Sequence, residues 1–202
     1  SKLLAEKLKE INVNNEILYQ VSDTLVSTYN PEHIAGGTKK KLLLANLLGK
    51  RFDLTKASLD KLKIATLLYD IGNTMLPKEI LSKKEPLTDD DRDFIKQHPV
   101  IAAREILEPI SNIVEIIPII EKHHENWNGT GYPNKISGEN IPIESQIILI
   151  VDSYFALMEN RPYRKALSKE DAIKTIMEDS NSKWSAKLAN EFVNVIREDF
   201  EA

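Results

Sequence analysis

Two aspartates and three histidines are the residues best suited to chemistry, because they supply the oxygen and nitrogen ligands of a metal site. Asp152 lies in the middle of Ile147–Met158, an apolar run on an expected helix. A carboxylate buried there needs a metal, a cation or strong hydrogen-bond donors as its partner. A buried ion pair or a partly exposed helix face is the alternative to a metal.

Asp70 raises a similar question at the end of a helix expected over 57–70. Its carboxylate faces the negative end of the helix dipole, which is unfavourable without a nearby positive charge. A bound cation would remove that conflict. A solvated aspartate at a helix end is the alternative.

Three of the four histidines stand near expected helix ends: His98 before Pro99, and His123 and His124 before a glycine-bearing loop. Neutral imidazole is a common ligand of first-row metals. Adjacent helical residues point about 100° apart, so the pair could serve different metals or roles. A surface pair and a simple helix-start residue are the alternatives. Together with the aspartates, the set predicts an iron, manganese or zinc site that activates water, most often for phosphate-ester hydrolysis.

The composition excludes several classes of protein. The chain of 202 residues contains no cysteine, which removes disulfide scaffolds, thiolate zinc sites and cysteine nucleophiles. Its 27 basic and 31 acidic residues give a net charge of −4 and no reason to expect nucleic-acid binding. The longest apolar stretch is 12 residues, too short to span a membrane. Without an apolar signal core at its start, the sequence indicates a cytoplasmic protein or a cytoplasmic piece of one.

Helices must position these residues, because the apolar residues of the sequence recur with helical periodicity. No segment alternates apolar and polar residues as a strand does, so the sequence predicts an all-α fold. Gly72 is expected to cap the helix over 57–70, and Thr88 with Asp91 forms a capping box. Ser168 is expected to begin a later helix, and a loop over 125–143 carries three glycines. The other expected helices cover 3–29, 38–52, 99–108, 111–122, 144–159 and 184–200.

The segment His123–Pro133, HHENWNGTGYP, closely resembles the HHExxDGxGYP signature of HD-GYP domains. That family is a branch of the HD phosphohydrolases, and its active members hydrolyse cyclic di-GMP. Residues 69–88 follow the family's HDIGK…P…IL.K…LT stretch, and residues 161–164 match its RPYR run. The resemblance covers about 31–200. It implies a multi-helix HD-GYP-like bundle over 31–202, preceded by a helical segment over 1–30.

The resemblance also carries over a metal shell that is incomplete in this sequence. The positions that match family ligands are Asp70, which is also the candidate catalytic residue, His98, His123, His124 and Asp152. Five positions depart from the family pattern: Gly37 (or Gly36) and Tyr69 replace histidines, Asn73 replaces a lysine, and Asn128 and Phe155 replace aspartates. A phenol is a poor substitute for neutral imidazole, so we expect one iron, manganese or zinc ion, or none.

Substrate-binding residues are better preserved. Tyr132 offers a stacking face to guanine, and Arg161 and Arg164 are suited to pairing with phosphates. The run Lys39–Lys41 is expected to be only a solvated helix start.

These residues predict a degenerate HD-GYP-like domain of bacterial cyclic di-GMP signalling, a binding or regulatory module with weak or no phosphodiesterase activity. The alternative is an active phosphodiesterase with a reduced metal site of Asp70, His98, His124 and Asp152. Expected partners are cyclic di-GMP or a related nucleotide and other signalling proteins. Residues 1–30 either pack back on the core or form a homodimer.

Overall fold

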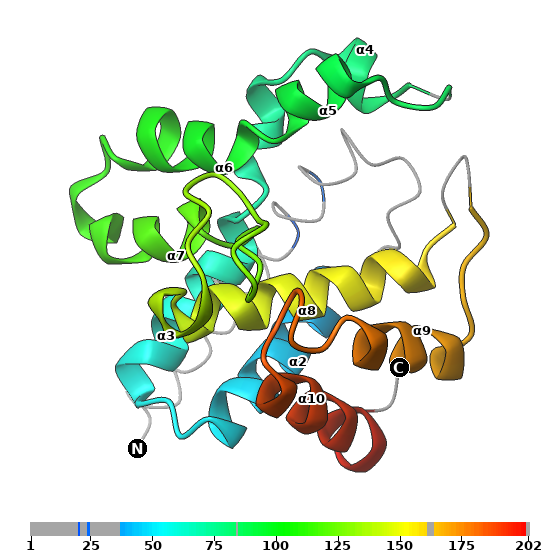
Figure 1. Cartoon of the computed structure of the whole chain (residues 1–202). Helices are drawn as coiled ribbons and strands as arrows, with labels where there is room; N and C mark the ends of the chain where they lie inside the picture. The colour runs from blue at the N-terminus through cyan, green and yellow to red at the C-terminus, as the bar shows by residue number, and fades with distance from the viewer. Residues whose placement is uncertain (1–19, 21–23, 25–36, 84, 161–163, 201–202) are drawn as a thin grey trace.

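The computed structural model describes residues 20, 24, 37–83, 85–160 and 164–200, and these residues form a helical bundle that contains no strand (Figure 1). The expected all-α fold is confirmed, whereas the helix expected over 3–29 lies outside the described residues except for Gln20 and Thr24. The α-helices are α2 (Gly37–Arg51), α3 (Lys56–Leu68), α4 (Lys78–Leu81), α5 (Asp89–Ile95), α6 (His98–Ile101), α7 (Ile117–Glu121), α8 (Ile143–Met158), α9 (Lys169–Glu178) and α10 (Ala186–Glu198). Shorter turns are η1 (Ile71–Met75), η2 (Ala102–Leu107), η3 (Ser111–Ile116) and η4 (Gly138–Asn140).

Side-chain caps fix where several helices begin. The hydroxyl of Thr88 accepts from the backbone N–H of Asp91, whose carboxylate accepts in return from the N–H of Thr88. Ser168 caps α9 in the same way, by accepting from the N–H of Asp171. Each cap satisfies an N–H group that the first helical turn leaves without a partner. Both predicted helix starts are confirmed.

Helix α8 crosses the middle of the bundle and forms its apolar centre (yellow in Figure 1). It packs on α2 and α9, and α10 packs on α2 and α9 in turn. Tyr154 of α8, Phe192 of α10 and Trp184 are almost fully buried together in this core. Side chains of this size dominate the burial energy of a core, and α2 packs on α8 beside them, so the core fixes where these two helices place their polar residues.

The sequence predicts that Gly72 caps the helix over 57–70, and this prediction is wrong. Helix α3 ends at Leu68 with Tyr69 as its C-cap, and Gly72 lies inside the 3₁₀ turn η1. A Cβ atom on Gly72 would lie 2.0 Å from the carbonyl oxygen of His98. The glycine is needed for this close approach, which brings the start of α6 against η1.

Two helices that the periodicity predicts are each built from two different turns. The region expected over 99–108 consists of α6 followed by the π-helical turn η2, and the region over 111–122 consists of η3 followed by α7. Pro118 lies in the first turn of α7. Proline lacks an N–H group, so it fits a helix start and interrupts a longer helix there.

None of the helices in the described part of the chain is long and apolar enough to cross a membrane.

Candidate metal centre

Three histidines from two separate segments meet in one cluster. His98 is the first residue of α6, and His123 and His124 follow the end of α7. One ligand atom from each imidazole lies within 4.8 Å of the others. His98 is 3% exposed and His123 is fully buried. The structure therefore brings together three of the five predicted ligands.

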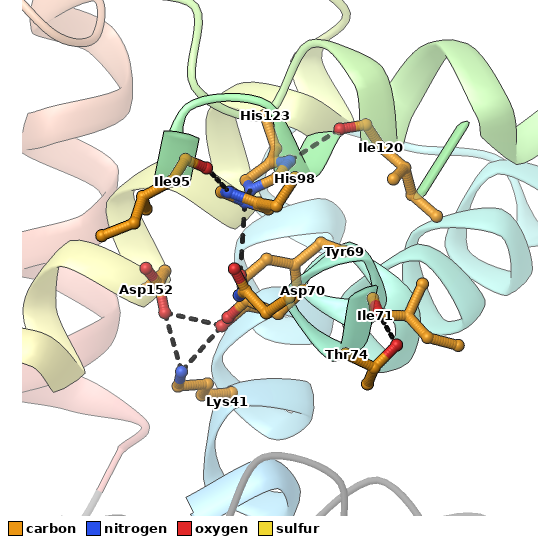
Figure 2. Close-up of polar contacts among 11 residues, drawn as sticks. Lys41, Tyr69, Asp70, Ile71, Thr74, Ile95, His98, Ile120, His123 and Asp152 are labelled. Atoms are coloured by element: carbon orange, nitrogen blue, oxygen red, sulfur yellow. Dashed lines mark hydrogen bonds and ion pairs between the residues drawn. The ribbon is translucent and has the colours of Figure 1, made fainter. Parts of the chain in front are cut away.

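The protons on the imidazole rings of His98 and His123 are fixed by backbone carbonyls. Nδ1 of His98 lies 2.8 Å from the carbonyl oxygen of Ile95, and Nδ1 of His123 lies 2.6 Å from that of Ile120 (Figure 2). A carbonyl only accepts, so each Nδ1 carries the proton and each Nε2 exposes a lone pair. Metal-binding histidines are oriented by hydrogen bonds of this kind.

Nε2 of His98 lies close to two other acceptor atoms. It is 3.2 Å from Nε2 of His123 and 3.4 Å from Oδ1 of Asp70. Acceptor atoms at these distances repel unless a cation or an extra proton lies between them.

Burial makes an extra proton on His123 or His124 unfavourable. It lowers the pKa of His123 far below the usual range, with the neighbouring imidazoles adding to the effect. Burial also lowers the pKa of His124, to about 3. At neutral pH both rings are therefore neutral, and the donor set fits a metal ion of the iron, manganese or zinc type.

Asp70 stands beside this cluster between α3 and η1. Its Oδ1 accepts a hydrogen bond from Nδ2 of Asn73 over 3.0 Å. Burial raises the pKa of Asp70, while His98 partly offsets that effect. Asn73, one of the positions that depart from the family pattern, therefore holds the aspartate carboxylate in place. The amide oxygen of Asn73 is buried without a hydrogen-bond partner in the described part of the chain.

Asp152 has different partners from the histidines. Nζ of Lys41 donates to Oδ1 of Asp152 over 2.7 Å, and the hydroxyl of Tyr69 donates to the same oxygen over 2.6 Å. Nζ of Lys41 also lies 2.7 Å from the hydroxyl oxygen of Tyr69, which closes a triangle (Figure 2). The ion pair, an alternative to a metal that the sequence left open, is therefore present, and Asp152 as a metal ligand remains a prediction.

The electrostatics of the triangle favour the charged forms. Burial opposes ionisation of Asp152, but the charge and hydrogen bond of Lys41 outweigh it and lower the pKa of the carboxyl. Burial likewise opposes the charge on Lys41, but Asp152 and Asp70 outweigh it and raise the pKa of the ammonium. The prediction that Lys39–Lys41 is only a solvated helix start is therefore wrong for Lys41, whose side chain is 13% exposed.

The glycine loop closes the centre from the side of His124. The rings of His124 and Tyr132 are stacked, with centroids 4.8 Å apart. A Cβ atom on Gly131 would lie 2.2 Å from the backbone nitrogen of Asn126, so this position needs glycine. Asn128 accepts from the N–H and the hydroxyl of Thr130, which makes it a loop-forming residue.

The two arginines cannot be treated alike. Arg161 lies outside the described residues. The guanidinium of Arg164 donates to the carbonyl oxygens of Ala156 and Leu157 in the last turns of α8. Its binding of substrate phosphate remains a prediction.

Sequence reasoning missed two residues, Lys41 and Glu125. Lys41 lies one helical turn after Gly37, so both share a face of α2, and this spacing is the signal that could have found it. Glu125 is 1% exposed and accepts from the N–H groups of Asn134 and Lys135, which shapes the loop.

Comparison with known proteins places these residues in a family. The HD domain family matches the chain over residues 20–188. Over 186 residues the chain is 27% identical to a cyclic di-GMP phosphodiesterase of Thermotoga maritima, which covers 91% of this chain and 50% of the relative. It is 31% identical over 155 residues to the cyclic di-GMP phosphodiesterase PdeB of Borreliella burgdorferi, covering 76% of this chain and 40% of that protein.

Solved structures show the same fold. A cyclic GMP-AMP specific phosphodiesterase of Vibrio cholerae superposes with a TM-score of 0.69 at 18% identity, covering 90% of this chain and 49% of that one. An HDG"Y"P protein of Bdellovibrio bacteriovorus superposes with a TM-score of 0.66 at 19% identity, covering 82% of this chain and 53% of that one. The chain spans about half or less of the length of these relatives. It belongs to the HD domain family and is distantly related to HD-GYP cyclic di-GMP phosphodiesterases.

Proposed function

We propose that this chain is a degenerate HD-GYP-like module of cytoplasmic cyclic di-GMP signalling, which binds a cyclic dinucleotide but hydrolyses it weakly or not at all. The observation that carries the proposal is the closed triangle at Lys41, Tyr69 and Asp152. The triangle and the histidine cluster with Asp70 lie side by side and are called the polar centre below. The triangle fills one half of this centre with the chain's own groups. We place the HD-GYP-like domain at 31–202 and treat 1–30 as a preceding helical segment.

One ion is proposed at the other half, with His98, His123 and His124 as ligands and Asp70 beside them. Such an ion supplies polarisation of a bound phosphate oxygen or of water. Burial keeps His123 and His124 neutral, backbone carbonyls orient the rings of His98 and His123, and Asn73 fixes the Asp70 carboxylate. Among the described residues, this is the half of the centre that brings three imidazoles together.

Nucleotide recognition is proposed at the glycine loop beside His124. Tyr132 stacks on His124 and presents an aromatic ring where a guanine base would lie. Arg161 and Arg164 are proposed to contact phosphates. Relatives named as acting on cyclic di-GMP and on 3'3'-cGAMP support a cyclic dinucleotide as the ligand class.

The test compares hydrolysis and binding in the same preparation. Protein loaded anaerobically with iron or manganese is expected to turn over cyclic di-GMP no faster than an Asp70→Ala variant. Calorimetric titration is expected to detect binding of cyclic di-GMP or 3'3'-cGAMP, and Tyr132→Ala is expected to weaken it. Clear hydrolysis that depends on Asp70, or no binding of either nucleotide, would contradict the proposal.

The second candidate function is an active phosphodiesterase with a reduced site at Asp70, His98, His124 and Asp152. The position of Oδ1 of Asp70, 3.4 Å from Nε2 of His98, favours it. This candidate predicts tightly bound transition metal and cyclic di-GMP hydrolysis that falls with Asp70→Ala. Metal binding without hydrolysis would contradict it.

A further inference from the structure

We propose that the ammonium group of Lys41 is a built-in cation that takes the place of a metal ion beside Asp152. The centre then carries two positive charges of different kinds: one exchangeable ion at the histidines and one fixed ammonium from α2. The part that concerns the exchangeable ion rests on the proposed function. The part that concerns Lys41 rests on contacts within the chain.

The carboxylate of Asp152 already has two hydrogen-bond donors. Its Oδ1 receives two hydrogen bonds, from Nζ of Lys41 at 2.7 Å and from the hydroxyl of Tyr69 at 2.6 Å. A divalent ion approaching this oxygen would have to displace both donors. Charge-assisted hydrogen bonds of this length are among the strong ones, so displacement is unfavourable.

The ammonium of Lys41 is held by two hydrogen bonds, one to Asp152 and one to Tyr69. Tyr69 accepts from Lys41 and donates to Asp152, so its hydroxyl links the two charged groups. The ring of Tyr69 also packs edge-on against His123, with centroids 5.1 Å apart. The triangle is therefore joined directly to the histidine cluster.

The carboxylates around Lys41 require a nearby positive charge. Lys41 lies within electrostatic reach of Asp152, Asp70 and Glu159. Buried carboxylates without compensating charge are costly, and a metal or an ammonium can supply it. Unlike a metal, an ammonium tethered to α2 cannot be removed by chelation or exchanged with solvent.

The neighbouring lysine shows that the arrangement is specific. Lys40 is exposed on the same helix, whereas Lys41 turns inward one residue later. The two differ in direction by about 100°, so only one of them can reach the centre. Lys40→Met is therefore a matched control for Lys41→Met.

The first test asks whether Asp152 binds metal. Cobalt(II) is titrated into the chelator-treated protein, and stoichiometry and affinity are measured by calorimetry and visible absorption. We expect one cobalt ion per chain, and an Asp152→Asn variant whose affinity stays within about threefold, well below the ~10–100-fold typical of a lost metal-supporting group. Two ions per chain, or a loss of tenfold or more in Asp152→Asn, would overturn the proposal.

The second test asks whether a metal can replace the ammonium. In chelator, Lys41→Met is expected to unfold at a lower temperature than the unmodified protein, and added cobalt(II) or manganese(II) should restore the loss. Lys40→Met should match the unmodified protein at every ion concentration. A loss in Lys41→Met that divalent ions leave unchanged, or no loss, would overturn the proposal.

The two tests separate this inference from the proposed function. Unmodified protein that binds no cobalt would refute an ion at the histidines, while the response of Lys41→Met to divalent ions would still decide the role of the lysine. If Lys41→Met does not fold even with added metal, the cobalt affinity of Asp152→Asn decides.

Discussion

The two halves of the polar centre solve the same problem in opposite ways. In one half, the Nε2 atoms of His98 and His123 lie 3.2 Å apart. In the other half, Asp152 and Tyr69 surround the ammonium of Lys41. One half collects acceptors and needs an added cation, whereas the other collects acceptors around a cation that the chain supplies.

This difference teaches how a metal-dependent fold can keep its architecture while its chemistry changes. The two halves are carried by different helices that pack on one another: α2 and α8 carry Lys41 and Asp152, whereas the histidines lie at α6 and after α7. Lys41 on α2 balances the carboxylate of Asp152 on α8. Under the proposal above, the fold is therefore retained although one of its ions is replaced.

The largest expected effect comes from breaking the histidine half. His123→Asn removes the ligand nitrogen of a fully buried ring. We expect cobalt(II) affinity to fall by at least about 100-fold, beyond the range that supporting groups produce. Calorimetric titration measures it, with Lys40→Met as control and circular dichroism as the check on folding. Unchanged affinity would mean that the ion, if bound, lies elsewhere.

A drop in pH should lower the free energy of unfolding of the metal-free protein through the histidines of the same half. The pKa of His124 is lowered to about 3 in the folded state, and that of His123 is lowered well below its usual value. The unfolded chain protonates these rings near pH 6.5, so unfolding is favoured as pH falls below that value. Each ring should remove up to about 1.4 kcal/mol of stability per pH unit between roughly pH 6 and 4.

Denaturant unfolding in chelator measures this slope. His124→Gln is expected to make it shallower, because one of the two titrating rings is gone. The raised pKa of Asp70 acts in the opposite direction, since the folded state then keeps a proton that the unfolded state releases. A slope equal in His124→Gln and in the unmodified protein would contradict the assignment.

Breaking the lysine half should have an intermediate effect. Lys41→Met leaves the partly buried carboxylate of Asp152 without its cation. We expect metal-free protein to lose about 2–4 kcal/mol, somewhat below the ~3–5 kcal/mol of a fully buried pair because both side chains keep some exposure. Denaturant unfolding gives the value, and a loss as small as that of Lys40→Met would contradict the ion pair.

The smallest effect should come from Tyr69→Phe, which removes one hydroxyl and keeps the ring against His123. The ion pair of Lys41 and Asp152 stays, so we expect a loss of about 1–2 kcal/mol in metal-free protein. Cobalt(II) affinity should remain within about threefold. A large fall in cobalt affinity would indicate that the two halves are not separate.

The sequence predicted most helices because their signals are local. The capping box at Thr88 and the cap at Ser168 depend on residues three positions apart, and both are present. The sequence does not show the tight turn at Gly72, because the close approach that requires glycine is to His98, a residue on another helix. Pro118 divides a helix that apolar periodicity alone makes continuous.

The histidine cluster can be predicted from the sequence more directly than the lysine triangle. His123 and His124 belong to a recognisable motif, and His98 stands at another position that matches the family. Lys41 and Asp152 lie 111 residues apart, and only the packing of α2 on α8 joins them. A buried ion pair is one of the alternatives to a metal that the sequence leaves open at Asp152, but its partner stands in a run of lysines that resembles an ordinary solvated helix start.

The most direct test of the central claim is a crystal structure of the full chain soaked with cobalt(II), with anomalous scattering collected at the cobalt edge. The account predicts one anomalous peak, bound by His98, His123 and His124, with Nζ of Lys41 still on the carboxylate of Asp152. A second peak at Asp152, with Lys41 displaced, would contradict it.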